Sequence, residues 1–205
     1  MSTWEKYGSG AERWSDQAYA DSRTYLARRA EVVRTLGPVL EPGDVVLDLA
    51  CGDGGLAEFL PDQRYIGVDA NAEMVEAARR RGRDVVHADL NDYEPKQSVA
   101  ATTIFRAIYY ARDRRALLAR IAGYTEKKLV FDLNPRQYAL DDVRAELREA
   151  GFERIDVRPF FMPQTRALSR PLTLLLRALE RSGPLALLVL RARFTYLVAA
   201  SGTKR

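Results

Sequence analysis

Acidic residues follow apolar runs at three points in the first half of this chain. Asp48 comes after Val45–Leu47, Asp69 closes the stretch that begins at Tyr65, and Asp89 closes a third stretch. Such runs predict buried strands, and in an open parallel sheet the ligand crevice lies at the carboxyl ends of the strands. Carboxylates there can accept hydrogen bonds from an ammonium group or from both hydroxyls of a ribose. The acids therefore predict a ligand site at one edge of the sheet.

A turn of small residues separates Asp48 from the next apolar segment. It reads ACGDGG from Ala50 to Gly55, and its glycines let the backbone approach a ligand without an intervening Cβ. The helix predicted after the turn offers unpaired N–H groups at its first turn. The same stretch satisfies the dinucleotide pattern G-x-G-x-x-G/A, so the glycines alone leave two ligand classes open.

The carboxylates of Asp48 and Asp53 distinguish between these ligands. A dinucleotide would place its doubly anionic pyrophosphate beside them, and like charges a few ångströms apart repel by about 1–4 kcal/mol. S-adenosylmethionine (SAM) carries an ammonium and a sulfonium, which the acids would attract. The residue types thus favour SAM over a nicotinamide dinucleotide.

The stretch LDLACGDG, Leu47–Gly54, closely resembles the first motif of the class I SAM-dependent methyltransferases, with Ala50 where many members have the first glycine. The resemblance covers roughly residues 40 to 160. It implies SAM as the cofactor, S-adenosylhomocysteine (SAH) as the product, and a small-molecule or lipid-like acceptor of the methyl group. It also implies a doubly wound α/β fold, in which helices cover both faces of a mostly parallel seven-stranded sheet and the seventh strand is inserted antiparallel.

The resemblance assigns roles to the acids at the strand ends. Asp69 follows the turn at the interval of a ribose-binding carboxylate in nucleotide-binding βαβ units. In the resembled family an acid at the place of Asp89 accepts from the adenine amino group, and the next backbone N–H, here that of Leu90, reaches the ring. The predicted cofactor-binding residues are Asp48, Ala50, Cys51, Gly52, Gly54, Asp69, Ala70, Met74, Asp89, Leu90 and Arg106.

Two tyrosines, Tyr109 and Tyr110, follow the fourth predicted strand, where the family often has a leucine and a histidine. They are candidates for a general base, but the catalytic residue is otherwise unknown, because methyl transfer from a sulfonium mainly needs alignment and exclusion of water. Arg106 stands where metal-dependent members need an aspartate, so no metal is expected. The single histidine, His87, is interpreted as structural. The predicted acceptor-binding residues are Tyr7, Trp14, Tyr110 and Asn134.

Strands and helices alternate along the chain, which is typical of a parallel sheet covered on both faces. Residues 1–205 are predicted to form one domain, in which a helix over about Asp16–Leu36 belongs to an N-terminal cap, residues 1–40. The predicted strands after the turn are Tyr65–Asp69, Arg83–Leu90, Ser98–Phe105, Lys128–Leu133, Phe152–Phe161 and Phe194–Ala200, and longer helices are predicted at 71–82, 113–123 and 141–150.

Residues 162–193 form an amphipathic helical insertion before the last predicted strand. At 100° per residue, one sector holds Leu172, Leu175, Leu176 and Leu179, and the opposite sector holds Arg170, Arg177 and Arg181. Three interpretations stay open: leucines that cover the sheet beneath solvated arginines, a lid over an apolar acceptor, or a surface for anionic lipid or an anionic substrate.

Composition narrows the class of protein further. The chain has 205 residues, of which 47% are apolar and 29% charged, with a formal net charge of +4. One cysteine excludes an internal disulfide framework and suits a reducing compartment. The N-terminus lacks a signal-like apolar region, and no apolar run approaches the roughly 20 residues that span a bilayer. We therefore expect a cytoplasmic protein, peripheral to a membrane if 162–193 binds lipid.

Two other functions remain as alternatives to methyl transfer. One is an NAD(P)-dependent oxidoreductase on the same fold class, which the acids at the turn disfavour. The other is a non-catalytic peripheral membrane or partner-binding module with an idle crevice. The basic residues are scattered, so nucleic-acid binding is not expected, and the oligomeric state is unknown from the sequence.

Overall fold

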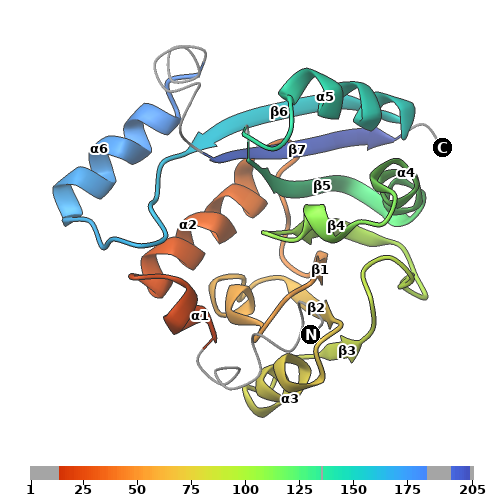
Figure 1. Ribbon diagram of the computed structural model, residues 1–205, viewed down its shortest axis with the longest axis horizontal. Helices are drawn as coiled ribbons and strands as arrows, with labels where there is room; N and C mark the ends of the chain where they lie inside the picture. The colour runs from red at the N-terminus through yellow and green to blue at the C-terminus, as the bar shows by residue number, and fades with distance from the viewer. Residues whose placement is uncertain (1–13, 135, 184–194, 204–205) are drawn as a thin grey trace.

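A computed structural model describes residues 14–134, 136–183 and 195–203 of the chain. Its strands form one seven-stranded sheet in the order β3-β2-β1-β4-β5-β7-β6 (Figure 1). Strands β1 to β5 pair in parallel, whereas β7 is antiparallel to both β5 and β6. This confirms the predicted sheet with its antiparallel last strand. The strands are β1 (Val45–Leu49), β2 (Arg64–Asp69), β3 (Val85–His87), β4 (Val99–Ile104), β5 (Thr125–Leu133), β6 (Phe152–Phe160) and β7 (Thr195–Thr203).

Helices cover both faces of this sheet, as the alternation of elements predicts. Along β1 the side chains alternate between two cores: Leu47 and Leu49 pack with α4 and α5, whereas Val46 packs with α2 and η2. The acids at the carboxyl ends of β1 and β2 therefore lie at one edge, between the two layers. The helices are α1 (Trp14–Ala18), α2 (Ser22–Thr35), α3 (Ala72–Arg80), α4 (Arg114–Tyr124), α5 (Leu140–Glu149) and α6 (Arg170–Glu180), with 3₁₀ turns η2 (Gly55–Phe59) and η3 (Ile108–Tyr110).

The single N-terminal helix that the periodicity predicts over residues 16–36 is wrong, because the chain breaks between α1 and α2. The Asp21 side chain accepts a hydrogen bond from the Thr24 N–H at 3.0 Å and thereby caps α2. Just before this cap, the Ala20 N–H donates to the Gln164 carbonyl at 2.8 Å. The break turns α1 away from the axis of α2 and toward the glycine turn (Figure 1).

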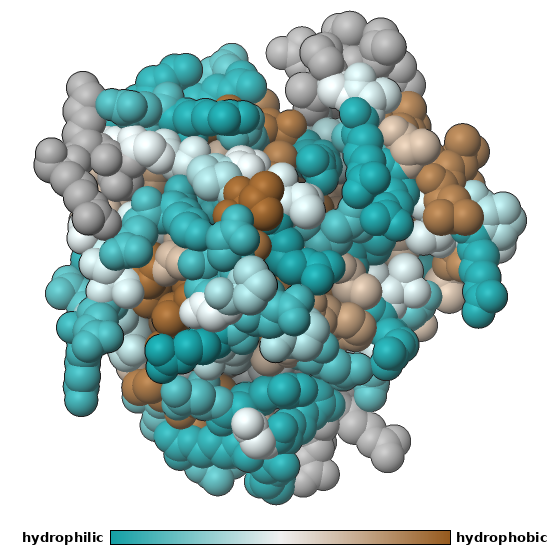
Figure 2. Space-filling model, turned by 180° about the vertical axis from the view of Figure 1, so that it is seen from behind, coloured by the Kyte–Doolittle hydropathy of each residue, from teal (hydrophilic) through white to brown (hydrophobic). Residues whose placement is uncertain are grey.

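Helix α6 faces the body of the protein with its charged residues, not with its leucines. Leu172, Leu174 and Leu175 are 40%, 63% and 64% exposed. Figure 2 shows this apolar surface on the right, beside hydrophilic side chains. The interpretation that the leucines cover the sheet is therefore wrong for Leu172 and Leu175, whereas Leu176 and Leu179 of the same sector are partly buried.

Two of the three arginines of the predicted sector face α2, whereas Arg170 is exposed. Arg177 forms an ion pair with Glu31 of α2 at 2.9 Å, and Arg181 pairs with the same carboxylate. Glu180, which is 2% exposed, pairs with Arg28 of α2. The second leucine-rich piece, residues 184–193, lies outside the described residues. No helix within the described ranges is long and apolar enough to span a membrane.

Candidate active site

Alternate residues of the turn after β1 adopt the left-handed region. The φ angles of Ala50, Gly52 and Gly54 are 58°, 59° and 67°. A Cβ at Gly52 would lie 3.0 Å from Cδ1 of Trp14, so this glycine serves both the turn and the close approach of the indole. Ala50 adopts a conformation that glycine tolerates and other residues reach at a cost of about 1–2 kcal/mol.

The element after the turn is a five-residue 3₁₀ helix, η2, and not the α-helix that the sequence predicts. Side chains near η2 accept hydrogen bonds from backbone N–H groups that a helix N-terminus would otherwise offer to a ligand. The Gly52 N–H donates to the Asp69 carboxylate at 2.8 Å, and the Gly55 N–H donates to Asp53 at 3.2 Å. Carboxylates of the chain itself therefore hold this turn in shape.

Asp48, at the end of β1, is a buried carboxyl held by two hydroxyls. It accepts hydrogen bonds from the Thr103 hydroxyl at 2.6 Å and from the Tyr65 hydroxyl at 2.8 Å. Burial raises its pKa to about 6, despite these two bonds, which favour the charged form. A cationic ligand beside Asp48 would return the pKa toward its ordinary value.

Asp69, at the end of β2, organises the adjoining backbone. Its two oxygens accept from the N–H groups of Gly52 and Asn71, both at 2.8 Å, while the Asn71 side chain caps α3. Burial raises the pKa of Asp69, and the two backbone bonds oppose that shift. Each carboxylate oxygen keeps a further lone pair, so Asp69 can still accept from a ligand hydroxyl.

Asp53 does not face the crevice. Its carboxylate accepts from the Ser15 N–H at 3.0 Å and from the Ser15 hydroxyl at 2.5 Å, and it forms an ion pair with Arg81 at 3.2 Å. The argument that Asp53 repels a pyrophosphate is therefore wrong, because Arg81 already balances this charge. Asp53 instead attaches α1 to the glycine turn and so holds Trp14 over Gly52.

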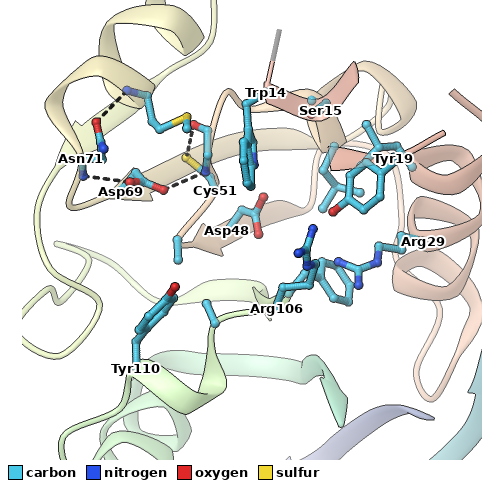
Figure 3. Close-up of a pocket in the computed structure, with 18 of the residues that line it drawn as sticks. Trp14, Ser15, Tyr19, Arg29, Asp48, Cys51, Asp69, Asn71, Arg106 and Tyr110 are labelled. Atoms are coloured by element: carbon cyan, nitrogen blue, oxygen red, sulfur yellow. Dashed lines mark hydrogen bonds between the residues drawn. The ribbon is translucent and has the colours of Figure 1, made fainter. Parts of the chain in front are cut away.

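The pocket beside the turn contains most of the predicted cofactor residues (Figure 3). Among its lining residues, those predicted for cofactor, acceptor or base are Trp14, Asp48, Ala50, Cys51, Gly52, Asp69, Met74, Arg106, Tyr109 and Tyr110. The other lining residues include Ser15, Tyr19, Leu26, Arg29, Asn71 and Phe105. The pocket thus combines carboxylates from two neighbouring strands with aromatic and cationic groups from other elements.

Four predicted cofactor residues are not among those that line this pocket. Gly54 faces away, since a Cβ there would meet Arg83 and Ala78. Asp89 accepts from both nitrogens of Asn91, at 2.8 and 2.7 Å. The remaining two residues are Ala70, which precedes α3, and Leu90, which is 4% exposed and packs in the core.

A second cavity adjoins the first at Arg106 and Tyr109, which line both. It holds Asn134, one of the predicted acceptor residues, close to the ends of β4 and β5. Its other lining residues are Ile108, Asp132, Gln137, Tyr138, Gln164 and Thr195. Tyr7 lies outside the described residues. The cavity is rich in amides and hydroxyls.

Arg29 is a charged pocket residue that the sequence interpretation missed. Its guanidinium is 2% exposed, pairs with Asp132 at 2.5 Å and lies 4.8 Å from the Tyr25 ring. The available signal is its position on α2, because Arg29 falls on the same helical face as Leu26 and Val33. An arginine within an apolar helical face predicts a buried ion pair, although not its partner.

Comparison with known proteins finds a methyltransferase domain within part of the chain. Residues 46–128 match the model of a family described as a methyltransferase domain. Trans-aconitate 2-methyltransferases are similar in sequence. The protein from Rhodococcus jostii is 39% identical over 79 residues, which cover 37% of this chain and 31% of the relative. The protein from an Azoarcus strain is 31% identical over 135 residues, which cover 61% and 52%.

Solved structures share the fold. A chain from a complex between the Haloferax volcanii Trm112 methyltransferase activator and a methyltransferase matches with a TM-score of 0.70 at 18% identity, covering 100% of this chain and 99% of that one. Phosphoethanolamine N-methyltransferase 2 from Haemonchus contortus, in complex with SAM, matches with a TM-score of 0.62 at 18% identity, covering 86% and 53%. Identities this low show the fold alone. Together with the match of residues 46–128 to a methyltransferase domain, they support the predicted class I SAM-dependent methyltransferase with its Rossmann-like fold.

Proposed function

We propose that this chain transfers the methyl group of SAM to a small polar acceptor. The observation that carries the proposal is the pair Asp48 and Asp69. These acids end neighbouring parallel strands and line one pocket beside a left-handed turn. When bound, SAM supplies a methyl group that its sulfonium has already activated.

The residues around the turn suit the parts of this cofactor. Asp48 would accept a hydrogen bond from the ammonium of the amino-acid portion. The positive charge of that group would stabilise the buried carboxylate. Asp69 would accept from the ribose hydroxyls with its remaining lone pairs. Trp14, held over Gly52 by the contact of Ser15 with Asp53, would cover the amino-acid end and exclude water. The Asp89 and Leu90 assignments to adenine stay predictions.

The second cavity favours a polar acceptor over a lipid-like one. Asn134, Gln137 and Gln164 present amides there, and Tyr138 and Thr195 present hydroxyls. Such groups bind hydrogen-bonding ligands and leave an alkyl chain poorly accommodated. The relatives named for trans-aconitate methylation also support a small molecule.

Tyr109 and Tyr110 remain the candidates for a general base, because both line the first pocket and lie after β4. Since the methyl donor is activated, we expect Tyr109→Phe and Tyr110→Phe each to lower turnover by no more than the roughly 10²–10⁴-fold of one acid–base group.

The hypothesis of contact with an anionic membrane changes with the orientation of α6. Leu172, Leu174 and Leu175 are exposed and could enter an interface, but Arg177 and Arg181 pair with Glu31 and are not directed at lipid phosphates. A membrane-binding α6 should therefore co-sediment with neutral and anionic vesicles almost equally. Failure to bind either kind of vesicle would remove this hypothesis.

Calorimetric titration with SAM, SAH, NAD and NADP tests the proposed function. Binding of SAM and SAH alone is expected, because the buried acids attract a cationic ligand and repel a pyrophosphate. Binding of NAD or NADP in preference to SAM would favour the oxidoreductase alternative. Binding of none of the four would favour the non-catalytic module.

A further inference from the structure

Gln164 lies between β6 and α6 in the chain, and it contacts the N-terminal elements at two places. Its backbone carbonyl accepts a hydrogen bond from the Ala20 N–H at 2.8 Å, at the break between α1 and α2. Its side-chain amide donates to the Tyr25 hydroxyl of α2 at 3.3 Å. Gln164 also lines the second cavity. It therefore connects the wall of that cavity to the point at which α1 turns away from α2.

Tyr25 joins Gln164 to the wall of the first pocket. The Tyr25 ring is stacked on the Tyr19 ring, with 4.0 Å between the centroids and 19° between the planes. The Arg29 guanidinium donates to the Tyr25 hydroxyl at 3.0 Å. Tyr19 and Arg29 both line the first pocket, and Figure 3 shows them on the same side of it. Because Tyr25 is 1% exposed and protein interiors are close-packed, a displacement of its hydroxyl must move one of these neighbours.

Tyr19 directly follows α1, the helix that carries Trp14 over the glycine turn. The Tyr19 N–H donates to the Ser15 carbonyl at 3.2 Å, and Ser15 is bonded to Asp53 of that turn. Helix α1 is thus held at its start by Asp53 and at its end by the contacts of Tyr19 and the next residue. A helix of five residues is too short to be stable alone, so its position depends on these contacts.

The Gln164 amide has capacity for one further contact. An amide has an oxygen that accepts and an NH₂ group that donates, and within the described part of the chain only the NH₂ group is hydrogen-bonded. The oxygen can therefore accept from a hydrogen-bond donor in the second cavity. The bond to Tyr25 is long for an N–H donor. A donor on the oxygen would orient and polarise the amide, which strengthens that bond.

We propose that Gln164 is a positioning residue that couples the two cavities. An acceptor that donates a hydrogen bond to the Gln164 amide oxygen, through a hydroxyl or an N–H group, holds α1 closed over SAM. This inference rests on the proposed function. Coupling between two binding sites is reciprocal, so a cofactor held under α1 must in turn order Gln164. The cap then closes fully only when both ligands are bound, which protects the activated methyl group from water.

SAH alone tests this coupling, without an identified acceptor. In the unaltered protein, SAH should slow amide hydrogen exchange at residues 160–166, although Gln164 is not among the residues that line the first pocket. Gln164→Ala should largely abolish that slowing and make SAH dissociate about 2- to 10-fold faster in stopped flow, the effect of one neutral hydrogen bond. Gln63→Ala removes a glutamine that donates to the Glu41 carbonyl outside both cavities; as the matched control it should change neither quantity.

Tyr25→Phe tests whether Gln164 acts through the Tyr25 hydroxyl. The change keeps the ring that stacks on Tyr19. The double variant with Gln164→Ala should release SAH no faster than the faster of the two single variants, because both changes break the same contact. Additive effects of the two changes would overturn the inference.

Two small amides test the kind of group that the second cavity takes. Acetamide has N–H donors and should slow SAH dissociation from the unaltered protein but not from Gln164→Ala. N,N-dimethylacetamide has no donor and should leave the rate unchanged in both proteins. Equal effects of the two amides, or no effect of acetamide, would overturn the assignment of a hydrogen-bond donor.

The outcomes separate this inference from the function on which it rests. If Gln164→Ala lowers the stability in urea but releases SAH at the unaltered rate, Gln164 is structural; the inference is overturned and the proposed function stands. The same holds if SAH slows exchange in α1 but not at residues 160–166. Absence of any SAH binding to the unaltered protein would overturn both.

Discussion

Two neighbouring arginines of α2 contact different parts of the molecule. Arg28 faces α6, where it pairs with Glu31 and Glu180. Arg29 faces the pocket, where it pairs with Asp132 beside Arg106. Both arginines are buried and both form ion pairs, so neither burial nor pairing tells a structural charge from a functional one.

The difference lies in whether each buried charge has an ion-pair partner and whether the cluster borders a cavity. At the α2–α6 junction two buried carboxylates meet three arginines, and the contacts join two elements without lining either cavity. At the strand ends, Asp48 is held by hydroxyls and Arg106 by a tyrosine ring, and both line a pocket. A buried charge that lacks an opposite charge and borders a cavity is the better indicator of a ligand.

The largest effect on folding is expected at the α2–α6 junction. Glu180→Ala removes one of the two carboxylate partners of Arg28 and the acceptor of the Phe161 N–H, so that three arginines of the junction share the single carboxylate of Glu31. The free energy of unfolding should fall by about 3–5 kcal/mol. Urea denaturation measures it, and Arg28→Met combined with Glu180→Leu should recover much of the loss. If Glu180→Ala leaves the stability unchanged, this junction is not structural.

Asp48→Asn, in the cluster at the strand ends, should raise the stability of the protein while weakening its binding of SAM. Because the folded pKa of Asp48, about 6, lies above the ordinary aspartate value of 3.8, ionisation of Asp48 opposes folding at neutral pH. The variant should be more stable by about 1–3 kcal/mol at pH 7.5. This advantage should shrink toward pH 5, because the unaltered protein gains stability there as Asp48 becomes protonated.

The same Asp48→Asn variant should bind SAM about tenfold or more weakly, through loss of a charged hydrogen-bond partner. Denaturation at the two pH values and calorimetry with SAM check the two halves of the prediction. A variant that is less stable at pH 7.5, with SAM affinity intact, would place Asp48 among the structural charges.

Ser15→Ala tests the contact that holds α1 on the glycine turn. It removes the hydroxyl bond to Asp53 but keeps the backbone bond, so a loss of about 1 kcal/mol in unfolding free energy is expected. Trp14 should then cover the pocket less tightly, and SAM should dissociate faster in stopped-flow fluorescence. Ser22→Ala, which removes an exposed bond to Asp16, is the control and should change neither quantity appreciably.

Ala50→Gly is expected to have the smallest effect and the opposite sign. Glycine relieves the left-handed φ of 58°, partly offset by the greater chain entropy of the unfolded state. The stability should rise by about 0.5–1 kcal/mol by urea denaturation. Ala122→Gly within α4 should instead lower it by a similar amount, as glycine does in helix interiors. Destabilisation by Ala50→Gly would show that packing of the Ala50 methyl group stabilises the protein by more than its backbone strain destabilises it.

The parts of the structure that depend on local sequence pattern could be predicted from the sequence. Apolar runs that end in an acid locate β1 and β2, and the glycine turn locates the pocket between them. The orientation of α6 was not predictable, because helical period separates its two faces but does not say which turns inward. Glu31, which lies far away in the sequence, decides that by pairing with Arg177 and Arg181.

The second cavity could not be predicted from local sequence pattern either. It combines Arg106, Asn134, Gln164 and Thr195, which come from four separate parts of the chain. Asn134 could be predicted because it follows a strand, whereas Gln164 and Thr195 carry no such signal. The role of Asp53 was misread for a related reason, since its partners Ser15 and Arg81 belong to other elements.

Calorimetric titration of SAM into Asp69→Ala tests the central claim most directly, that uncompensated acids at the ends of β1 and β2 form the cofactor site. Asp62→Ala, at an exposed acid just before β2, is the control. The account predicts that Asp69→Ala weakens SAM binding by about 1.5–3 kcal/mol, while Asp62→Ala binds as the unaltered protein does. SAM affinity that is unchanged in a folded Asp69→Ala protein would contradict it.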